Sequence, residues 1–99
     1  MKITKQKTGT TLEIALDDRL DTVTAPELDA EIRKGLLDGV ENLVWDFSDL
    51  EYITSAGIRV LLQAQRIMFG QGSMKILHAN EMVTEVFSLT GLDDMLNEE

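Results

Sequence analysis

Alternating hydrophobic and polar positions near the N-terminus predict two short strands. They span residues 3–6 and 11–16 and are separated by Thr8-Gly9-Thr10, a turn-prone sequence. In the second segment leucine and isoleucine alternate with more polar residues, and this period of two is typical of a strand with one buried face. The polar run Asp17-Asp18-Arg19 interrupts the alternation, so we expect the strand to end before it.

A helix start follows at Thr24. This residue can cap the helix, Pro26 suits the first turn, and Glu27 stands three positions after Thr24, which forms a T-x-x-E capping box. Leucine and isoleucine then recur every fourth position from 28 to 36, so that they stack along one helical face. Gly39 is the expected C-terminal stop.

The rest of the chain alternates between strands and helices. A continuous apolar run at 43–47 predicts a central strand that is covered on both faces. After it we expect, in order, a loop over 48–53, a helix over 55–69, a strand over 74–78, a helix capped by Asn80 and ended near Gly91, and one or two helical turns within 92–99.

The order of these elements indicates the fold class. Strands that are joined through helices are usually parallel, with right-handed crossovers. We therefore expect one α/β domain over residues 1–99. It should contain a mostly parallel sheet of about four to five strands, with an antiparallel N-terminal strand and helices packed against the sheet.

Composition and charge narrow the possible partners. The chain has 99 residues, 43% of them hydrophobic, which suits one modest core. Eighteen acidic residues against nine basic ones give a net charge of −9. Direct nucleic-acid binding is not expected, because it depends mainly on Lys and Arg contacts to phosphate. The acidic surface either keeps the protein soluble through self-repulsion or is complementary in charge to a basic partner. The sequence contains neither a signal peptide nor an apolar run that could span a membrane, so we expect the cytoplasm.

Familiar catalytic and metal-binding patterns are missing from the sequence. There is no cysteine, which excludes disulfides and thiolate metal sites. His78 is the only histidine, so an H-E-x-x-H zinc site is not expected. A Ser-His-Asp triad could use only His78, and it is not expected because the G-x-S-x-G motif is absent. Both the phosphate-binding P-loop and the G-x-G-x-x-G motif are absent. The chain is therefore predicted to be a binding protein that is not an enzyme and that requires no metal or cofactor.

The segment 46–59 contains the most informative chemistry. A strand is followed by a loop and by a helix that begins at Thr54 and Ser55, next to the small residues Ala56 and Gly57. Sites in α/β sheets gather at the carboxyl ends of strands, and the first N–H groups of a helix favour a negative group. The two hydroxyls can be interpreted as a simple helix cap or as a site for an anionic group.

Three segments resemble the STAS family, whose small stand-alone members are anti-sigma factor antagonists. Residues 46–62 resemble its "D-x-S … D-S-[ST]-G-L-x-x-L" signature, with Thr54 in place of the usual acid and Ala56 in place of the second hydroxyl. Residues 19–28 resemble its "G-x-L-D … A-P-E-L" stretch, and Thr90-Gly91-Leu92 resembles a late "G-L" motif. The similarity extends over nearly the whole chain.

This resemblance implies a partner-switching cycle. The unmodified protein would bind an anti-sigma factor, often itself an ATP-dependent serine kinase, and so release a sigma factor. The kinase would then phosphorylate Ser55, with Thr54 as the weaker alternative acceptor, and a serine phosphatase would restore binding. The residues expected to contact the partner are Asp21, Thr22, Asp49, Thr54, Ser55, Gly57, Ile58, Arg59 and Leu62.

Several details of this hypothesis depend on where the side chains lie. Ile58 and Leu62 suit the core as well as a contact surface. Asp21, Asp46, Asp49 and Glu51 are expected near one edge of the sheet, where a phosphate would add to their negative charge. Alternative functions are a STAS subunit that binds a transporter ATPase or a signalling assembly without a phosphorylation cycle, and a nucleotide-binding STAS domain.

Overall fold

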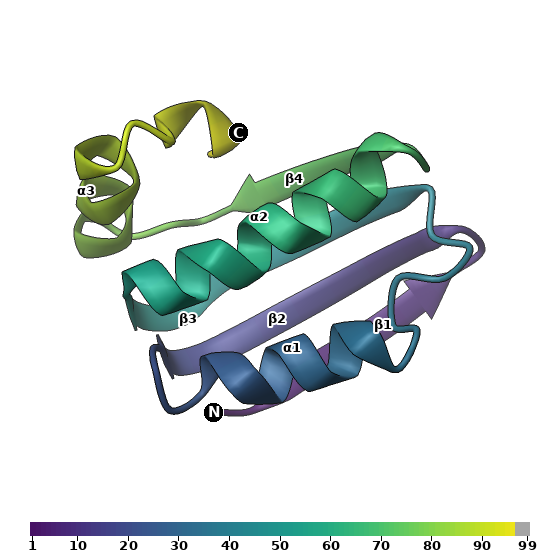
Figure 1. Cartoon of the computed structure of the whole chain (residues 1–99), viewed down its shortest axis with the longest axis horizontal. Helices are drawn as coiled ribbons and strands as arrows, with labels where there is room; N and C mark the ends of the chain where they lie inside the picture. Colours follow the sequence, from purple (N-terminus) through teal and green to yellow (C-terminus); the bar gives the residue numbers. More distant parts are fainter. Residues whose placement is uncertain (97–99) are drawn as a thin grey trace.

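Four strands form one mixed sheet in the order β1-β2-β3-β4 (Figure 1). The computed structural model describes residues 1–96. β1 is antiparallel to β2, whereas β2, β3 and β4 are parallel, so the predicted sheet is confirmed. The elements along the chain are β1 (Ile3–Thr8), β2 (Thr11–Leu20), α1 (Ala25–Arg33), β3 (Asn42–Ile53), α2 (Ser55–Phe69), β4 (Ser73–Leu77), α3 (Glu81–Leu89) and the 3-10 helix η1 (Asp93–Met95).

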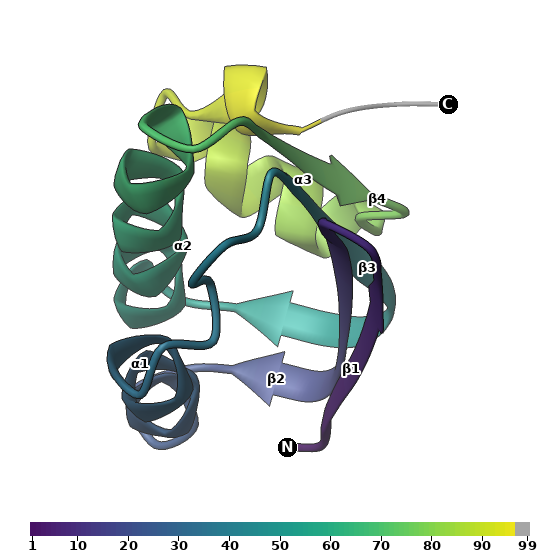
Figure 2. The same ribbon diagram turned by 90° about the vertical axis from the view of Figure 1, so that its right-hand side faces the viewer.

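Helices α1 and α2 lie side by side on the same face of the sheet (Figures 1 and 2). Alternate strand residues point into the core beneath them, whereas intervening residues such as Glu13 are exposed. Helix α3 follows β4 and packs against β3. The buried strand residues are Leu12, Ile14, Leu16 and Leu20 from β2, Leu43, Trp45, Phe47, Leu50 and Ile53 from β3, and Ile76 from β4.

Strands β2 and β3 are longer than the sequence pattern predicts. The predicted break at Asp17-Asp18-Arg19 is wrong, because these residues remain within β2. The predicted loop over 48–53 is also wrong, because those residues form the second half of β3. The two strands stay paired through register shifts between Ala15 and Asp17 and between Asp18 and Arg19. Such irregularities change which residues face the core without ending the strand.

The helix ends also correct two predictions. Thr24 precedes α1 but forms no side-chain cap, because its hydroxyl donates to the carbonyl of Arg19 at 2.7 Å. The capping box is therefore not formed. Helix α1 ends at Arg33, and Gly35 leaves the helical path with a φ of +100°, so Gly39 is not the stop.

The C-terminal predictions agree better with the structure. The Asn80 side chain accepts a hydrogen bond of 2.8 Å from the N–H of Val83, which confirms the predicted cap of α3. The expected helical turn in the tail is the short η1 helix. The remaining part of that tail, residues 97–99, lies outside the described residues.

Candidate functional site

The ends of β2 and β3 place two loops next to each other. Leu20, at the end of β2, pairs with Ile53, at the end of β3. Immediately beyond them, the N–H of Thr54 donates to the carbonyl of Leu20 at 3.0 Å. The loop that begins at Asp21 and the helix that begins at Ser55 therefore leave the sheet from adjacent positions.

The two hydroxyls at the start of α2 have different environments. Ser55 is the first residue of α2 and is exposed. Thr54 precedes it in an extended conformation, and its Oγ1 is buried without a hydrogen-bond partner among the described residues. Ser55 is thus the hydroxyl that an external enzyme can reach, whereas Thr54 would have to move before it could react.

Gly57 allows α2 to approach the sheet closely. A Cβ atom at this position would lie 2.7 Å from both Cγ and the carbonyl oxygen of Leu20, and 2.9 Å from Cγ1 of Ile53. These separations are too short for real Cβ contacts. Gly57 is buried, so its role is to seat the helix that carries Ser55, and the expected contact with a partner is not supported.

The loop after β2 is held by hydrogen bonds within the loop. Oδ1 of Asp21 accepts from the N–H groups of Val23 and Thr24, at 2.9 and 3.1 Å. The Thr24 hydroxyl accepts from the N–H of Asp21 at 2.9 Å. The backbone donors of Thr24 and Val23, followed by the Thr24 hydroxyl and the charge of Arg19, hold the pKa of Asp21 below its ordinary value. Asp21 therefore shapes the loop, in addition to its expected place at the contact surface.

This loop presents an apolar side chain that the sequence analysis missed. Val23 is 76% exposed, at the tip of the turn that Asp21 stabilises. The available signal was a single apolar residue within an otherwise polar loop, at residues 21–24. A single exposed valine is ordinary on a protein surface, so Val23 joins the candidate contacts only because its loop adjoins the start of α2.

A groove between α1 and α2 lies next to Ser55. Its volume is about 410 Å³, and it is lined by one side of α1 along its whole length, by the first half of α2 and by Thr22 of the preceding loop. Of the predicted contact residues, Thr22 and Arg59 line this groove. Leu62 is half-buried on the same helix, whereas Ile58 is only 3% exposed and belongs to the core. The groove is lined by Thr22, Ala25, Pro26, Asp29, Arg33, Ala56, Arg59, Val60 and Gln63.

The acidic residues expected at one edge of the sheet are distributed over different places. Asp49 lines a shallow hollow with Lys2, Thr4 and Asp17, and it does not line the groove beside Ser55. Asp46 accepts from the N–H and hydroxyl of Ser48, which lowers its pKa, and it pairs within the sheet rather than at a strand end. Asp46 and Asp49 therefore do not join Asp21 beside the start of α2, whereas Glu51 is exposed near the end of β3.

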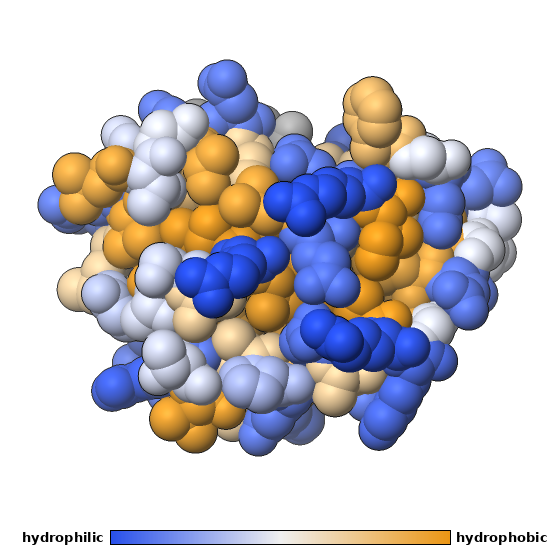
Figure 3. All heavy atoms as spheres, in the orientation of Figure 1, coloured by the Kyte–Doolittle hydropathy of each residue, from blue (hydrophilic) through white to orange (hydrophobic). Residues whose placement is uncertain are grey.

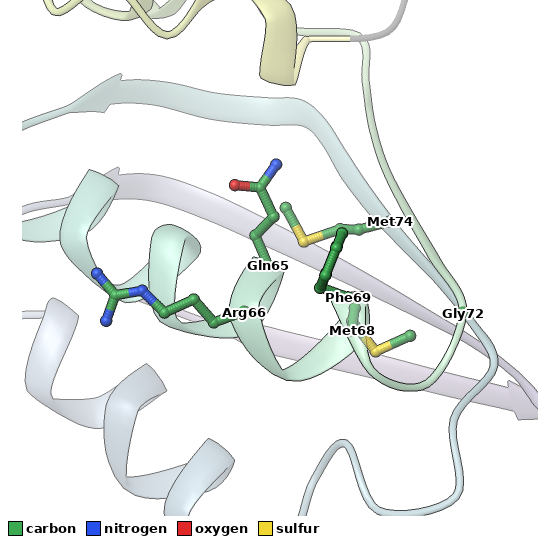
Figure 4. Close-up of a pocket in the computed structure, with 6 residues that line it drawn as sticks. All are labelled: Gln65, Arg66, Met68, Phe69, Gly72 and Met74. Carbon is green, nitrogen blue, oxygen red and sulfur yellow. The ribbon is translucent and has the colours of Figure 1, made fainter.

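A second hollow lies at the opposite end of α2. It has a volume of about 400 Å³ and is formed by residues from the end of α2 and the beginning of β4 (Figure 4). Phe69 beside it is 92% exposed. The two polar side chains that line this hollow, Gln65 and Arg66, are both exposed, and Arg66 forms no ion pair within residues 1–96. The lining residues are Gln65, Arg66, Met68, Phe69, Gly72 and Met74.

The described residues contain neither a metal-binding cluster nor a membrane-spanning helix. Within residues 1–96, no group of three or more acidic or histidine side chains is arranged to hold a metal ion. None of the described helices combines the length and the hydropathy that a membrane span requires.

Comparison with known proteins identifies the family. The sequence profile of the STAS domain matches residues 2–98. The chain belongs to the STAS family. It is 34% identical over 92 residues to BtrV of Bordetella bronchiseptica, a protein named as an anti-sigma factor antagonist, and the match covers 92% of this chain and 79% of BtrV.

Solved structures with the same fold include two forms of one STAS antagonist. The anti-sigma factor antagonist SpoIIAA in its unphosphorylated form has a TM-score of 0.86, with 23% identity, over 99% of this chain and 88% of SpoIIAA. Its phosphorylated form, described as a Bacillus cell fate determinant, has a TM-score of 0.77 and the same identity, over 99% of this chain and 91% of the other. At this identity the likeness demonstrates a shared STAS fold.

Proposed function

We propose that this protein is an anti-sigma factor antagonist that is switched by phosphorylation of Ser55. In this proposal the unmodified protein binds an anti-sigma factor through the start of α2, the Asp21–Thr24 loop and the adjoining groove. Binding releases a sigma factor, and phosphorylation of Ser55 ends the interaction. The protein acts in the cytoplasm as a binding partner, with a serine kinase and a serine phosphatase as the enzymes of the cycle.

The accessible hydroxyl of Ser55 is the observation that carries the proposal. Ser55 is exposed at the first position of α2, whereas the neighbouring Thr54 hydroxyl is buried. The name of the relative BtrV supports antagonism of an anti-sigma factor. The existence of SpoIIAA in phosphorylated and unphosphorylated forms supports a modification cycle on the same fold.

The chemical step is a phosphoryl transfer that the partner would catalyse. Oγ of Ser55 attacks the γ-phosphorus of ATP, the bond to the β,γ-bridging oxygen breaks, and ADP leaves. The hydroxyl proton passes to a base on the kinase. A phosphatase reverses the modification by hydrolysis, in which water supplies the oxygen of the released inorganic phosphate. This chain contributes only the nucleophile and the rigid helix that presents it.

The added group is sufficient to end binding without refolding. A phosphate brings about −1.5 to −2 charges at neutral pH, together with its bulk. Two like unit charges about 4 Å apart repel by roughly 4 kcal/mol at an effective dielectric constant near 20. Each 1.4 kcal/mol corresponds to about a tenfold change in affinity. Even part of this repulsion, acting on a carboxylate of the partner close to Ser55, would therefore eject a partner that covers Ser55.

The decisive experiment combines mapping of the modified residue with binding measurements. The protein is incubated with ATP and the serine-kinase anti-sigma factor encoded in the same genome, and mass spectrometry locates the phosphate. We expect it on Ser55. Isothermal titration should then show that Ser55→Asp binds the anti-sigma factor at least about tenfold more weakly, whereas Ser55→Ala binds within about threefold of wild type and is not phosphorylated.

A matched variant at the other end of α2 makes the result specific. Phe69→Ser alters a residue of that helix that is 92% exposed and should retain wild-type affinity. Phosphate on a different residue, or equal binding by Ser55→Asp and Ser55→Ala, would contradict the proposal. Equal binding would instead favour a STAS subunit that binds its partner constitutively.

A further inference from the structure

Helix α2 carries positive charge in a chain that is acidic overall. The 15 residues of α2 include Arg59 and Arg66 but no acid, whereas the whole chain has 18 acidic and nine basic residues. Figure 3 shows strongly hydrophilic side chains lying on hydrophobic surface across the face that α1 and α2 form. A cationic helix therefore borders the proposed binding surface.

Arg59 is the cation nearest in sequence to Ser55 along this helix. Its side chain is exposed and lines the groove between α1 and α2. Two ion pairs occur within residues 1–96, Lys5–Glu31 and Arg33–Asp29, so Arg59 has no ionic partner there. A free guanidinium at this place is available for an anion.

The spacing of Ser55 and Arg59 suits a pair on one helical face. Residues four apart on a helix have Cβ atoms about 5–6 Å from each other, and an anion on the N-terminal side of a cation is the favourable order. Helix α1 contains the same arrangement across the groove. There Nε of Arg33 lies 2.7 Å from Oδ2 of Asp29, which precedes it by four residues.

We infer that Arg59 is the internal counter-ion of phosphoserine at position 55, because an unpaired guanidinium lies one helical turn beyond an exposed hydroxyl on the same helix. This inference rests on the proposed phosphorylation of Ser55 and adds a second element to its regulation. In the unmodified protein Arg59 is free to pair with a carboxylate of the anti-sigma factor. In the modified protein the guanidinium turns to the phosphate. Phosphorylation thus adds an anion to the binding surface and withdraws a cation from it.

The pairing can be measured in the protein alone. Phosphoserine is incorporated at position 55 of the full chain during translation, and the ³¹P chemical shift is followed as a function of pH. A nearby cation favours the dianionic phosphate, so the second pKa of the phosphate should be lower in wild type than in Arg59→Gln, by about 0.15–0.4 pH unit. Arg59→Lys should restore part of the shift, and 1 M salt should reduce it because salt screens exposed charges.

Arg66→Gln is the matched control. It removes the other arginine of α2, which lies eleven positions from Ser55, and should titrate as wild type does. Thermal unfolding would establish that each variant is folded. Equal phosphate pKa values in wild type and Arg59→Gln, or an equal change in Arg66→Gln, would overturn the inference.

The outcome is separable from that of the proposed function. Because phosphoserine is supplied by translation, the titration requires neither a kinase nor a partner. Loss of binding in Ser55→Asp combined with an unchanged titration would refute only the role of Arg59. A shifted titration combined with phosphate on a different residue would refute only the assignment of Ser55 as the natural acceptor.

Discussion

The beginning and the end of α2 differ in how firmly their side chains are held. At the beginning, Gly57 lies against Leu20 and Ile53 with no room for a Cβ atom, and the N–H of Thr54 bonds to Leu20. At the end, Phe69 is almost fully exposed, and methionine and arginine side chains surround an open hollow (Figure 4). The hollows at the two ends have almost the same volume.

This comparison shows that volume alone does not distinguish the proposed site from the hollow at the other end of α2. Arg66 and Phe69 at the end of α2 are exposed, and exposed long side chains can fill or open a hollow at little cost, so they define no fixed chemistry. The beginning of α2 instead presents one reachable hydroxyl on a backbone that adjacent strands fix in place. A covalent switch depends on such a fixed position, since the added charge must appear at the same point of the binding surface every time.

The largest expected effect comes from adding one methyl group at the beginning of α2, and the same change at its end serves as the control. Gly57→Ala places a Cβ within 3 Å of two neighbouring residues, one contact being with backbone, so α2 must shift. Overpacking of this kind costs about 1–3 kcal/mol. We expect urea denaturation to show a loss of stability in this range, accompanied by weaker binding of the anti-sigma factor.

Gly70→Ala is the corresponding change at the C-terminal end of α2. A Cβ there would lie 3.8 Å from the carbonyl oxygen of Ile67, which is an ordinary contact, and the backbone has a φ of −87°. The variant should be as stable as wild type or slightly more stable, because alanine restricts the unfolded chain. A similar loss of stability in both variants would show that the two ends are equally tightly packed.

The periodic parts of the fold were predictable from the sequence. Leu12, Ile14 and Leu16 alternate into the core as expected, and α2 has the predicted bounds, 55–69. The polar runs were misjudged. Residues such as Asp17 and Asp49 lack the apolar signal of a strand, but they pair with each other in the ladder between β2 and β3. Tertiary pairing, which a local pattern does not contain, decides the structure of these segments.

The position of Ser55 in the candidate site was predictable from the sequence, whereas the positions of the surrounding residues were less so. The motif placed Ser55 at the start of a helix, and the structure places it there. It could not reveal that Ile58 faces the core, since one turn of an amphipathic helix contains both buried and exposed positions. The separation of Asp49 from Ser55 depends on the continuation of β3, which the sequence pattern had presented as a loop.

A smaller effect is expected from the two neighbouring hydroxyls. Thr54→Val removes a buried Oγ1 that has no partner within the described residues and keeps the side-chain shape. Because an unsatisfied buried hydroxyl is unfavourable, we expect a gain of up to about 1 kcal/mol in the free energy of unfolding. Ser55→Ala should change stability by less than about 0.5 kcal/mol, since its side chain is exposed. Thermal unfolding measures both, and a clear loss in Thr54→Val would reveal a hidden hydrogen bond.

The last and smallest expected effect is on stability at neutral pH, in the variant Asp21→Asn. Its dependence on pH in the acidic range identifies the carboxylate of Asp21 as the cause. Hydrogen bonds from Thr24 and Val23 favour its carboxylate in the folded protein, so its pKa lies below the ordinary value of 3.8. A carboxylate whose pKa is lower in the folded than in the unfolded protein stabilises the fold at pH values above the unfolded-state pKa. This stabilisation is lost as the pH falls through the folded-state pKa. Asp21→Asn keeps an oxygen acceptor for the turn but cannot titrate. Wild type should therefore be more stable than Asp21→Asn from neutral pH down to about pH 5, and this advantage should shrink below pH 3.8. Denaturation midpoints measured across this range would show the convergence, whereas an advantage that persists unchanged in acid would mean that the charge of Asp21 does not hold the loop beside Ser55.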